Sequence, residues 1–543
     1  MKTRVFHPEN GENEIKEAAR IIRDGGLLGI PTETVYGLGA NALDEAAVLH
    51  IFQAKGRPQD NPLILHVPDE SWLERYCEEE VSETAYLLAE KFWPGPLTMI
   101  LRGKDIVPRR TTGGLSTVGV RCPDHPVTRE IIRQAGVPVA APSGNTSGRP
   151  SPTSAADMLE DMDGKIDGIV DGGACRVGVE STIIDLTVTP PQLLRPGGLP
   201  LEALRQVIGE VSVDKAVTGN ASPDAPPRAP GMKYRHYAPH APVTVVTGQP
   251  ERSAAYIQAV VQPEEGVICF EEFREKFEPH TLQSLGSAED TAQQAHRVFD
   301  ALRRFDSTDV THIYAQCPDD AGLGLAVGNR LKKAAGFHVI NADALPDLVI
   351  GLTGGTGSGK TSALCALERL GGHIIDCDAV YHRELAANAA LRRDITRAFG
   401  DVFCNKKLDR QKLGQVVFSD PDALGRLNDI VNFHLLPSIR REAEGHLIVG
   451  LDAINLFESG LAAHCRETVA VLAPAEQRVK RIMQRDGISE AYAKLRIGAQ
   501  QPDEYYRLRC SRVLENRHDT AAEFSAQAEI FFRELIQEVF DHE

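Results

Sequence analysis

Features that would assign this chain to several classes of protein are missing from its sequence. Its ten cysteines are scattered, and none forms a C-x-x-C pair. This pattern argues against a zinc site or a disulfide framework and is typical of free thiols in a reducing compartment. No run of about 18 apolar residues occurs, so we expect no membrane span. The first residues are polar and charged, so we expect no signal peptide and predict a cytoplasmic protein.

An excess of positive charge is also missing, because 76 acidic residues outnumber 59 basic ones and give a net charge of −17. A large non-specific nucleic-acid surface needs a basic patch, so this charge argues against one. Small phosphorylated substrates remain compatible, because a few lysines and arginines suffice to bind them. The 42% hydrophobic and 25% charged residues are those of an ordinary globular protein.

The pattern of the sequence changes three times along the chain and predicts an α/β multidomain protein. Residues 1–208 alternate helical and strand patterns, as in a mixed α/β domain. Residues 209–242 are a proline-rich linker with a basic, aromatic end. Residues 243–345 alternate strands and helices, as in a small doubly wound domain. Residues 346–543 begin with an apolar strand that leads into a glycine-rich loop.

The first domain contains several short motifs that suit a polyphosphate and a carboxylate. Residues 31–39 hold hydroxyls and glycines after a strand. Lys55 and Arg57 are two apart on an extended segment, so both point to one side and suit a polyphosphate; the alternative is a solvated basic turn. Arg121 ends a strand, and the loop at residues 141–153 offers hydroxyls and free N–H groups to a phosphate or carboxylate.

In their order along the chain, these motifs closely resemble the threonylcarbamoyl-AMP synthase family, which has the YrdC-like fold. The matching segments are residues 31–39, 55–64, 117–123, 140–153, 178–185 and 194–197. The linker and the 243–345 domain resemble the long form of the family, which carries a second, Rossmann-like domain. The resemblance implies a nucleotidyltransferase that condenses L-threonine, bicarbonate and ATP to threonylcarbamoyl-AMP and pyrophosphate. The product is the donor for N6-threonylcarbamoyladenosine in tRNA, so we expect tRNA to be met only indirectly, through downstream transfer proteins.

The same resemblance implies roles for individual residues. The residues implied to hold ATP are Lys55, Arg57, Asn61, Thr117, Ser143, Asn145, Ser151, Arg195 and Tyr234. The residues implied to hold L-threonine are Thr34, His66, Arg121 and Ser181, with Arg121 at the carboxylate. For His66 a purely structural role is the alternative. Residues 233–237 are implied to form a lid in which Tyr234 and Arg235 face the ligand, with a plain tether as the alternative.

The chemistry of this reaction needs no protein nucleophile. The amine of threonine captures CO2 as a carbamate, and a carbamate oxygen attacks the α-phosphate of ATP. Charge then develops on that phosphate and on the leaving pyrophosphate. Lys55, Arg57 and Mg²⁺ would stabilise this charge.

The last domain begins with a phosphate-binding loop, because residues 354–361 fit G-x-x-x-x-G-K-[ST] between a strand and a helix. The backbone N–H groups and the helix N-terminus hold phosphate, Lys360 reaches the β- and γ-phosphates, and Thr361 offers its hydroxyl to Mg²⁺. A glycine-rich turn without nucleotide is the alternative. The residues predicted to bind ATP here are Gly357, Ser358, Gly359, Lys360, Thr361 and Ser362, together with Arg485 and Arg496.

Two carboxylates and a series of arginines follow this loop. Residues 373–378 read as a strand that ends in Asp376 and Asp378, whose side chains would share a face and converge near the loop. One of them could take a proton from an attacking hydroxyl or help to place Mg²⁺. The arginines from Arg478 to Arg496 recur along helices, as in a kinase lid; a solvated helix face is the alternative.

Together these features resemble dephospho-CoA kinase, which phosphorylates the ribose 3′-hydroxyl of dephospho-CoA with ATP. The resemblance implies that Asp376 or Asp378 is the base and that Arg485 and Arg496 are lid arginines on phosphate. The chain departs from the family where Ile454 and Asn455 replace the usual Pro-Leu, and where residues 432–434 replace the usual His-Pro. These changes fall on the acceptor side and leave the ATP side intact.

The sequence therefore predicts a bifunctional protein, a synthase followed by a kinase. One alternative is a synthase whose last domain is a regulatory nucleotide-binding module, and another is a kinase with a different acceptor. A third is an RNA-binding protein of the YrdC-like fold without synthase activity, although such a protein would need a basic groove.

Overall fold

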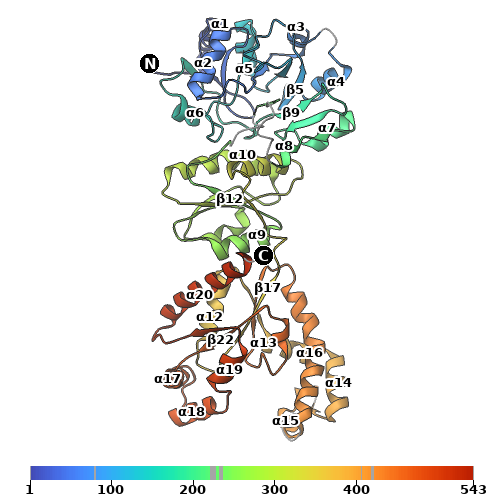
Figure 1. The fold of residues 1–543 in the computed structure, drawn as a ribbon, viewed down its shortest axis with the longest axis vertical. Helices are drawn as coiled ribbons and strands as arrows, with labels where there is room; N and C mark the ends of the chain where they lie inside the picture. The colour runs from blue at the N-terminus through green and yellow to red at the C-terminus, as the bar shows by residue number, and fades with distance from the viewer. Residues whose placement is uncertain are drawn as a thin grey trace. The chain divides into compact units, whose positions relative to one another are not determined.

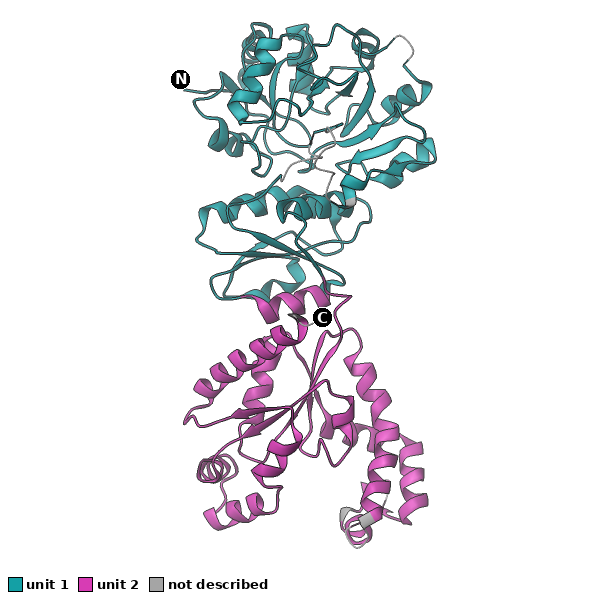
Figure 2. Ribbon diagram, in the orientation of Figure 1, with its two compact units in different colours: residues 1–250, 262–340 teal, residues 251–261, 341–543 magenta. Residues whose placement is uncertain are grey.

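The computed structural model describes residues 2–78, 81–219, 228–230, 236–404, 407–417 and 421–541 and divides into two compact units. Figure 2 shows residues 1–250 and 262–340 in teal and residues 251–261 and 341–543 in magenta. Helices alternate with strands in both units, which confirms the predicted α/β multidomain fold. None of the helices in the described ranges combines the length and apolar character that a membrane crossing requires.

The larger domain of the first unit is built on a mixed sheet that contains eleven strands among the described residues (Figure 1). In spatial order these are β1 (Arg4–Phe6), β8 (Gly168–Val170), β2 (Leu28–Ile30), β3 (Gly37–Asn41), β7 (Val139–Ala140), β4 (Ile64–His66), β6 (Thr117–Arg121), β5 (Leu97–Arg102), β9 (Thr182–Asp185), β10 (Gln192–Arg195) and β11 (Ser212–Val213). The helices are α1 (Glu12–Arg23), α2 (Glu45–Lys55), α3 (Leu73–Tyr76), α4 (Glu83–Phe92), α5 (Pro126–Ala135), α6 (Ala155–Met162), α7 (Leu201–Ile208) and α8 (Lys215–Thr218). Buried apolar side chains from the strands and the helices form one continuous core.

Local sequence signals decide where α2 begins and ends. The Asp44 carboxylate caps the helix by accepting hydrogen bonds from the N–H groups of Ala46 and Ala47. Gly56 ends it in the left-handed conformation, with a φ of 64°, which glycine adopts without steric cost. As a result, Lys55 stands in the last turn and Arg57 just beyond it. The prediction that both lie on an extended segment is therefore wrong, because the helix continues through Lys55.

The accessory domain of the first unit has a second sheet, in the spatial order β14 (Thr281–Ser284), β13 (Gly266–Cys269), β15 (Ile313–Gln316), β12 (Val243–Thr247) and β16 (Val339–Asn341). Pairs β12–β15, β13–β14 and β13–β15 are parallel. Its helices α10 (Thr291–Arg304) and α11 (Gly324–Ala334) pack against each other, and Figure 1 shows α10 between this sheet and the larger domain. Helix α9 (Pro250–Val260) follows β12 in the sequence, but most of it groups with the second unit.

The second unit has a parallel sheet in the spatial order β18 (His373–Asp376), β21 (Ile448–Asp452), β17 (Leu348–Thr353), β22 (Glu467–Leu472) and β23 (Arg512–Glu515). Its helices are α12 (Lys360–Arg369), α13 (Cys377–Ala387), α14 (Ala389–Phe399), α15 (Arg410–Val417), α16 (Pro421–Ala443), α17 (Ala475–Asp486), α18 (Glu490–Gly498), α19 (Asp503–Arg509) and α20 (Ala521–Asp541). Strands β19 (Phe403–Cys404) and β20 (Lys407–Leu408) pair antiparallel. Because the strands are parallel, their carboxyl ends meet at one edge, where ligands bind in open α/β sheets.

Candidate active sites

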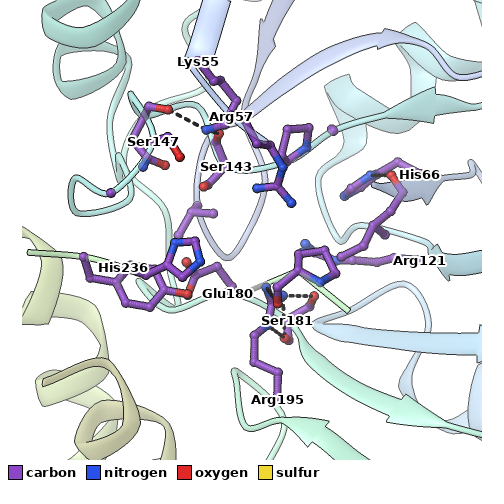
Figure 3. Close-up of a pocket in the computed structure, with 18 residues that line it drawn as sticks. Lys55, Arg57, His66, Arg121, Ser143, Ser147, Glu180, Ser181, Arg195 and His236 are labelled. Carbon is purple, nitrogen blue, oxygen red and sulfur yellow. Dashed lines mark hydrogen bonds between the residues drawn. The ribbon is translucent and has the colours of Figure 1, made fainter. Parts of the chain in front are cut away.

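The first unit contains a polar pocket whose walls come from segments far apart in the sequence (Figure 3). Its polar lining residues are Lys55, Arg57, His66, Arg121, Ser143, Asn145, Ser147, Glu180, Ser181, Arg195, His236 and Tyr237. The pocket therefore gathers four lysine and arginine side chains around one carboxylate, Glu180, an arrangement that suits a ligand with several negative charges.

Lys55 stands at one wall of this pocket and is only 2% exposed. Its Nζ donates hydrogen bonds to the carbonyl oxygens of Ser143 and Asn145, each at 2.5 Å. Burial, reinforced by the nearby charge of Arg57, lowers the pKa of Lys55 well below its usual range. Lys55 thus ties the end of α2 to the loop after β7, which brings the predicted serine and asparagine beside the predicted cations.

Arg121, at the end of β6, occupies a second wall. It is 4% exposed, forms an ion pair with Glu33 at 2.7 Å and donates to Oγ1 of Thr34 at 2.9 Å. His66 ends the neighbouring strand β4 and pairs with Arg121 in register. Burial, followed by the charge of Arg121, lowers the pKa of His66 to about 3, so this imidazole is neutral at physiological pH.

Ser181 and Arg195 form a third wall. Arg195 donates from Nη2 to the Ser181 carbonyl oxygen at 2.9 Å and to Ser181 Oγ at 3.1 Å. Thr98 Oγ1 lies 2.8 Å from the same Oγ. Burial lowers the pKa of Arg195 to about 10, which still leaves it charged.

Glu180 is the carboxylate among these cations, and the sequence analysis did not single it out. Its Oε1 accepts a hydrogen bond from Ser151 Oγ at 2.7 Å, and its Oε2 accepts one from Arg330 Nε at 2.8 Å. Burial by itself raises the pKa of Glu180, but the charges of Arg330 and Arg195 and these hydrogen bonds outweigh it and lower the pKa to about 2. The sequence carries Glu180 beside Ser181, yet nothing in it marks a single glutamate in a loop as a pocket residue.

The structure brings most of the residues predicted for ATP and threonine together. Those that line the pocket are Lys55, Arg57, His66, Arg121, Ser143, Asn145, Ser181 and Arg195. Thr34 and Ser151 lie one hydrogen bond behind it, on Arg121 and Glu180. Asn61 and Thr117 are not among the described residues that line the pocket. Tyr234 and Arg235, predicted for the lid, lie outside the described residues.

The second site lies at the carboxyl edge of the sheet in the second unit. The loop from Gly354 to Gly359 connects β17 to α12, as predicted, and Lys360 begins the helix. Lys360 Nζ forms an ion pair with Asp452, which ends the adjacent strand β21. Sequence analysis missed Asp452; its signal is an aspartate at the end of an apolar strand.

Side chains from α17 and from the segment after α18 hold this loop in place. Arg478 donates from Nε to the Thr356 carbonyl oxygen at 3.0 Å, and Gln500 donates to Thr356 Oγ1 at 2.8 Å. Arg481 donates to the Gly357 carbonyl oxygen at 3.1 Å. The predicted arginine-rich helix is therefore present as α17, and two of its arginines support the loop backbone directly.

The prediction that Asp376 and Asp378 share one face of a strand is wrong. Strand β18 ends at Asp376, and Asp378 lies in the first turn of α13. Asp376 caps that helix, because its Oδ1 accepts a hydrogen bond from the N–H of Ala379 at 2.9 Å. An aspartate carboxylate at this point can accept hydrogen bonds from backbone N–H groups and so start a helix, which the strand interpretation overlooked. Both side chains are exposed, and Asp376 pairs in register with Asp452.

Arg485 and Arg496, the predicted lid arginines, meet at one carboxylate. Both form ion pairs with Asp486, at 2.7 and 2.6 Å. Arg485, on α17, is exposed and Arg496, on α18, is partly exposed, and the two helices pack against each other. Asp486 therefore holds together the two arginines that are predicted to bind phosphate.

Comparison with known proteins identifies the parts of the chain. Family models match residues 20–197 (Telomere recombination), 199–336 (Threonylcarbamoyl-AMP synthase, C-terminal domain) and 348–522 (Dephospho-CoA kinase). The threonylcarbamoyl-AMP synthase of Pyrococcus abyssi is 50% identical over 332 residues, which cover 61% of this chain and 96% of the relative. That of Bacillus subtilis is 46% identical over 330 residues, 60% of this chain and 94% of the relative.

A solved structure agrees with these relatives. The crystal structure of P. abyssi Sua5 complexed with L-threonine is similar with a TM-score of 0.58 and 46% identity, over 63% of this chain and 99% of that one. Both families that match the chain use ATP as a substrate. The chain therefore belongs to the threonylcarbamoyl-AMP synthase family, in the form with a YrdC-like domain and a C-terminal accessory domain, and it carries a dephospho-CoA kinase family domain after them.

Proposed function

We propose that the protein is a bifunctional enzyme, in which the first unit makes threonylcarbamoyl-AMP and the second phosphorylates dephospho-CoA. The observation that carries the first half is the convergence of Lys55, Arg57 and Arg195 in the pocket that also holds Arg121. A triphosphate suits the first three residues, and an amino-acid carboxylate suits the fourth, because guanidinium groups bind both anions through paired hydrogen bonds.

The threonine end of the pocket is preorganised by Glu33. This carboxylate and Thr34 fix the guanidinium of Arg121 from one side, so its orientation is set before a ligand arrives. His66, neutral at physiological pH, can donate or accept a hydrogen bond there without adding charge. The synthase relative solved with L-threonine supports the assignment of this end of the pocket to threonine.

The phosphate end supplies fixed positive charge. A carbamate oxygen of the substrate attacks the α-phosphate, and pyrophosphate leaves with the electron pair of the broken P–O bond. Arg57 and Arg195 line this pocket and would stabilise the charge that develops, at no cost of reorganisation during the reaction. The product would serve N6-threonylcarbamoyladenosine formation at position 37 of tRNA, with tRNA itself handled by downstream transfer proteins.

The kinase half rests on the phosphate-binding loop and the carboxylates beside it. Lys360 would contact the β- and γ-phosphates, and Asp378 or Asp376 would take the proton of the ribose 3′-hydroxyl. Arg485 and Arg496 would bind phosphate from the lid side, with Gly357, Gly359 and the neighbouring loop N–H groups on the ATP phosphates.

Oxygen donors at the sheet edge fit Mg²⁺, which would be held mainly by the phosphates and by the hydroxyl of Thr361. The carboxylates of Asp376 and Asp452 stand at the ends of adjacent strands nearby. When bound, Mg²⁺ neutralises charge on the transferred phosphoryl group. The described ranges contain no group of three or more His, Cys, Asp or Glu side chains able to hold a metal, which agrees with an ion carried mainly by substrate.

The departures from the dephospho-CoA kinase family, at Ile454, Asn455 and residues 432–434, concern the acceptor of the kinase. Asn432 donates to the Ser459 carbonyl oxygen, and Asn428 donates to the Glu458 carbonyl oxygen at 2.6 Å, so α16 fixes the loop that follows β21. By resemblance to the family, these departures fall on the acceptor side. They favour a second candidate, a kinase with another acceptor or a regulatory nucleotide-binding module.

Two assays on the full-length chain test both halves. Wild type is incubated with Mg²⁺-ATP and either L-threonine and bicarbonate or dephospho-CoA, and the products are followed by mass. Lys360→Ala should lose CoA formation and keep threonylcarbamoyl-AMP, while Arg121→Ala should do the reverse. Absence of CoA with ATP still bound would reject dephospho-CoA as the acceptor, and absence of threonylcarbamoyl-AMP in wild type would reject the synthase.

A further inference from the structure

Arg330, on α11 of the accessory domain, is a fully buried cation that the proposed ATP and threonine sites do not use. Its side chain is 0% exposed. Nε donates to Glu180 Oε2 at 2.8 Å, and Nη1 donates to the Pro196 carbonyl oxygen at 2.8 Å. Burying a guanidinium is costly, and a buried ion pair is a weak source of stability compared with apolar packing. The location of Arg330 is better explained by what it orients.

Glu180, the ion-pair partner of Arg330, belongs to one wall of the synthase pocket. Glu180 and Ser181 both line it, and they sit in the loop that precedes β9. The accessory domain packs closely against the same loop at Gly178, where an added Cβ would lie 2.4 Å from the Cα of His296 on α10. The loop is thus positioned by two accessory helices, α10 and α11.

A second wall of the pocket also contacts Arg330. Its guanidinium carbon lies 5.6 Å from the ring centroid of Tyr237, a pocket residue. The ring of Phe299 on α10 also contacts this ring, with centroids 5.1 Å apart, and that of His236 lies 5.5 Å away. Tyr237 has a φ of 66°, a conformation that costs energy outside glycine and therefore needs such contacts to persist.

We propose that Arg330 is a positioning residue of the synthase site, which acts through Glu180 and Tyr237 and makes the accessory domain part of that site. This inference rests on the synthase function proposed for the pocket. Arg330 supplies two directed donors, one to the Glu180 carboxylate and one to the Pro196 carbonyl, and lysine cannot reproduce this fork. Without it, Glu180 stays buried but loses its ion-pair partner and one of its hydrogen bonds.

A second consequence concerns pH. The charge of Arg330 is the main factor that holds the pKa of Glu180 near 2 against the effect of burial, so Glu180 is ionised throughout the working range. The groups that face Glu180 are Arg330, Arg195, Ser151, Tyr237, Lys55, Lys333 and His236. Removal of Arg330 raises this pKa, and Glu180 then takes up a proton as the pH falls.

The test compares Arg330→Met, Arg330→Lys, Glu180→Gln and the double variant Arg330→Met/Glu180→Gln in the full-length chain, with threonylcarbamoyl-AMP formation as the readout. We expect kcat/KM to fall about 100-fold in Arg330→Met, the usual effect of a misplacement of about 1 Å in an active site. Arg330→Lys, which keeps the charge and protects the fold, should still lose about tenfold. The double variant should match Glu180→Gln alone, because Arg330 acts through Glu180.

Arg303→Met is the matched control. Arg303 is a second buried arginine of the accessory domain that bonds a buried carboxylate of the larger domain, Asp161, at 2.6 Å. Asp161 does not line the pocket among the described residues. Arg303→Met should therefore keep the wild-type pH profile, whereas Arg330→Met should lose activity as the pH is lowered.

Wild-type kcat/KM in Arg330→Met, equal losses in Arg303→Met, or effects of Arg330→Met and Glu180→Gln that multiply would each overturn the proposal. Threonylcarbamoyl-AMP formed by wild type in the same assay shows that such a result concerns Arg330 and not the proposed function. If wild type makes none, both fall together.

Discussion

The two sites of this chain are built in opposite ways. The phosphate-binding loop of the second unit is one continuous segment between β17 and α12, and its glycines and Lys360 are neighbours in the sequence. The pocket of the first unit takes its walls from segments between Val35 and Tyr237 and depends on a buried arginine of another domain. A site in one segment survives as a motif, whereas a dispersed site exists only when the sheet and loops have assembled.

The cationic side chains of the two sites also differ in how far they are buried and bonded to protein groups. Lys360 is partly exposed and meets one carboxylate, Asp452. In the first unit, Lys55, Arg121 and Arg195 are nearly fully buried and already bonded to protein groups. Substitutions in the first unit should therefore affect folding as well as catalysis, and those in the loop should affect catalysis alone.

The largest expected effect is that of Lys360→Ala on the kinase reaction. Loss of a fixed charge on the transferred phosphoryl group should lower kcat by about 1000-fold or more. Because Lys360 is partly exposed, the melting temperature should stay within a few degrees of wild type. A kinase rate within tenfold of wild type would show that this loop is not the phosphoryl-transfer site.

Arg121→Lys should raise the KM for L-threonine by about 100-fold, since a bidentate contact to a carboxylate is lost while the charge remains. The kcat measured at saturating threonine should change less. Steady-state kinetics with threonine varied at fixed ATP provide the check. An unchanged threonine KM would remove Arg121 from the proposed threonine site.

Arg533→Met should destabilise the second unit by about 2 kcal/mol, because a charged donor is lost from the end of α9. Arg533 Nη1 donates to the carbonyl oxygens of Ala259 and Val261, at 3.1 and 2.5 Å. Denaturant unfolding followed by kinase activity would measure this change. No loss of stability would show that α9 contributes little to the second unit, and residues 346–543 would then be expected to fold without it.

The last expected effect concerns His66 and pH, and it leaves stability near neutral pH unchanged. Its pKa in the folded protein, about 3, is below the ordinary value of 6.5, so the unfolded chain binds the extra proton between these values. His66 therefore favours folding above about pH 6.5, and this stability falls by roughly 1.4 kcal/mol per pH unit as the pH drops toward 3. His66→Asn should flatten the slope between pH 6 and about 4 by that amount. An identical slope in the variant would mean that His66 does not stay neutral when folded.

Particular residues show which features the sequence predicted correctly and which it did not. The strand, loop and helix around Lys360 were predicted because a local motif has a local geometry. Asp378 was placed on a strand because spacing alone cannot distinguish a strand end from a helix cap, and the capping bond of Asp376 decides it. Asn61 and Thr117, implied only by resemblance, are not among the described residues that line the pocket, and their roles stay predictions.

By itself, the sequence determined the α/β multidomain fold, the family of each part and the phosphate-binding loop, because these depend on periodicity and on contiguous motifs. Only the tertiary structure decided that Glu180 lies among cations, that Arg330 reaches it from the accessory domain, and that Asp452 meets Lys360. The reason is physical. Burial and pairing set the charge and orientation of these groups, and both arise from contacts between residues that are up to 150 positions apart in the chain.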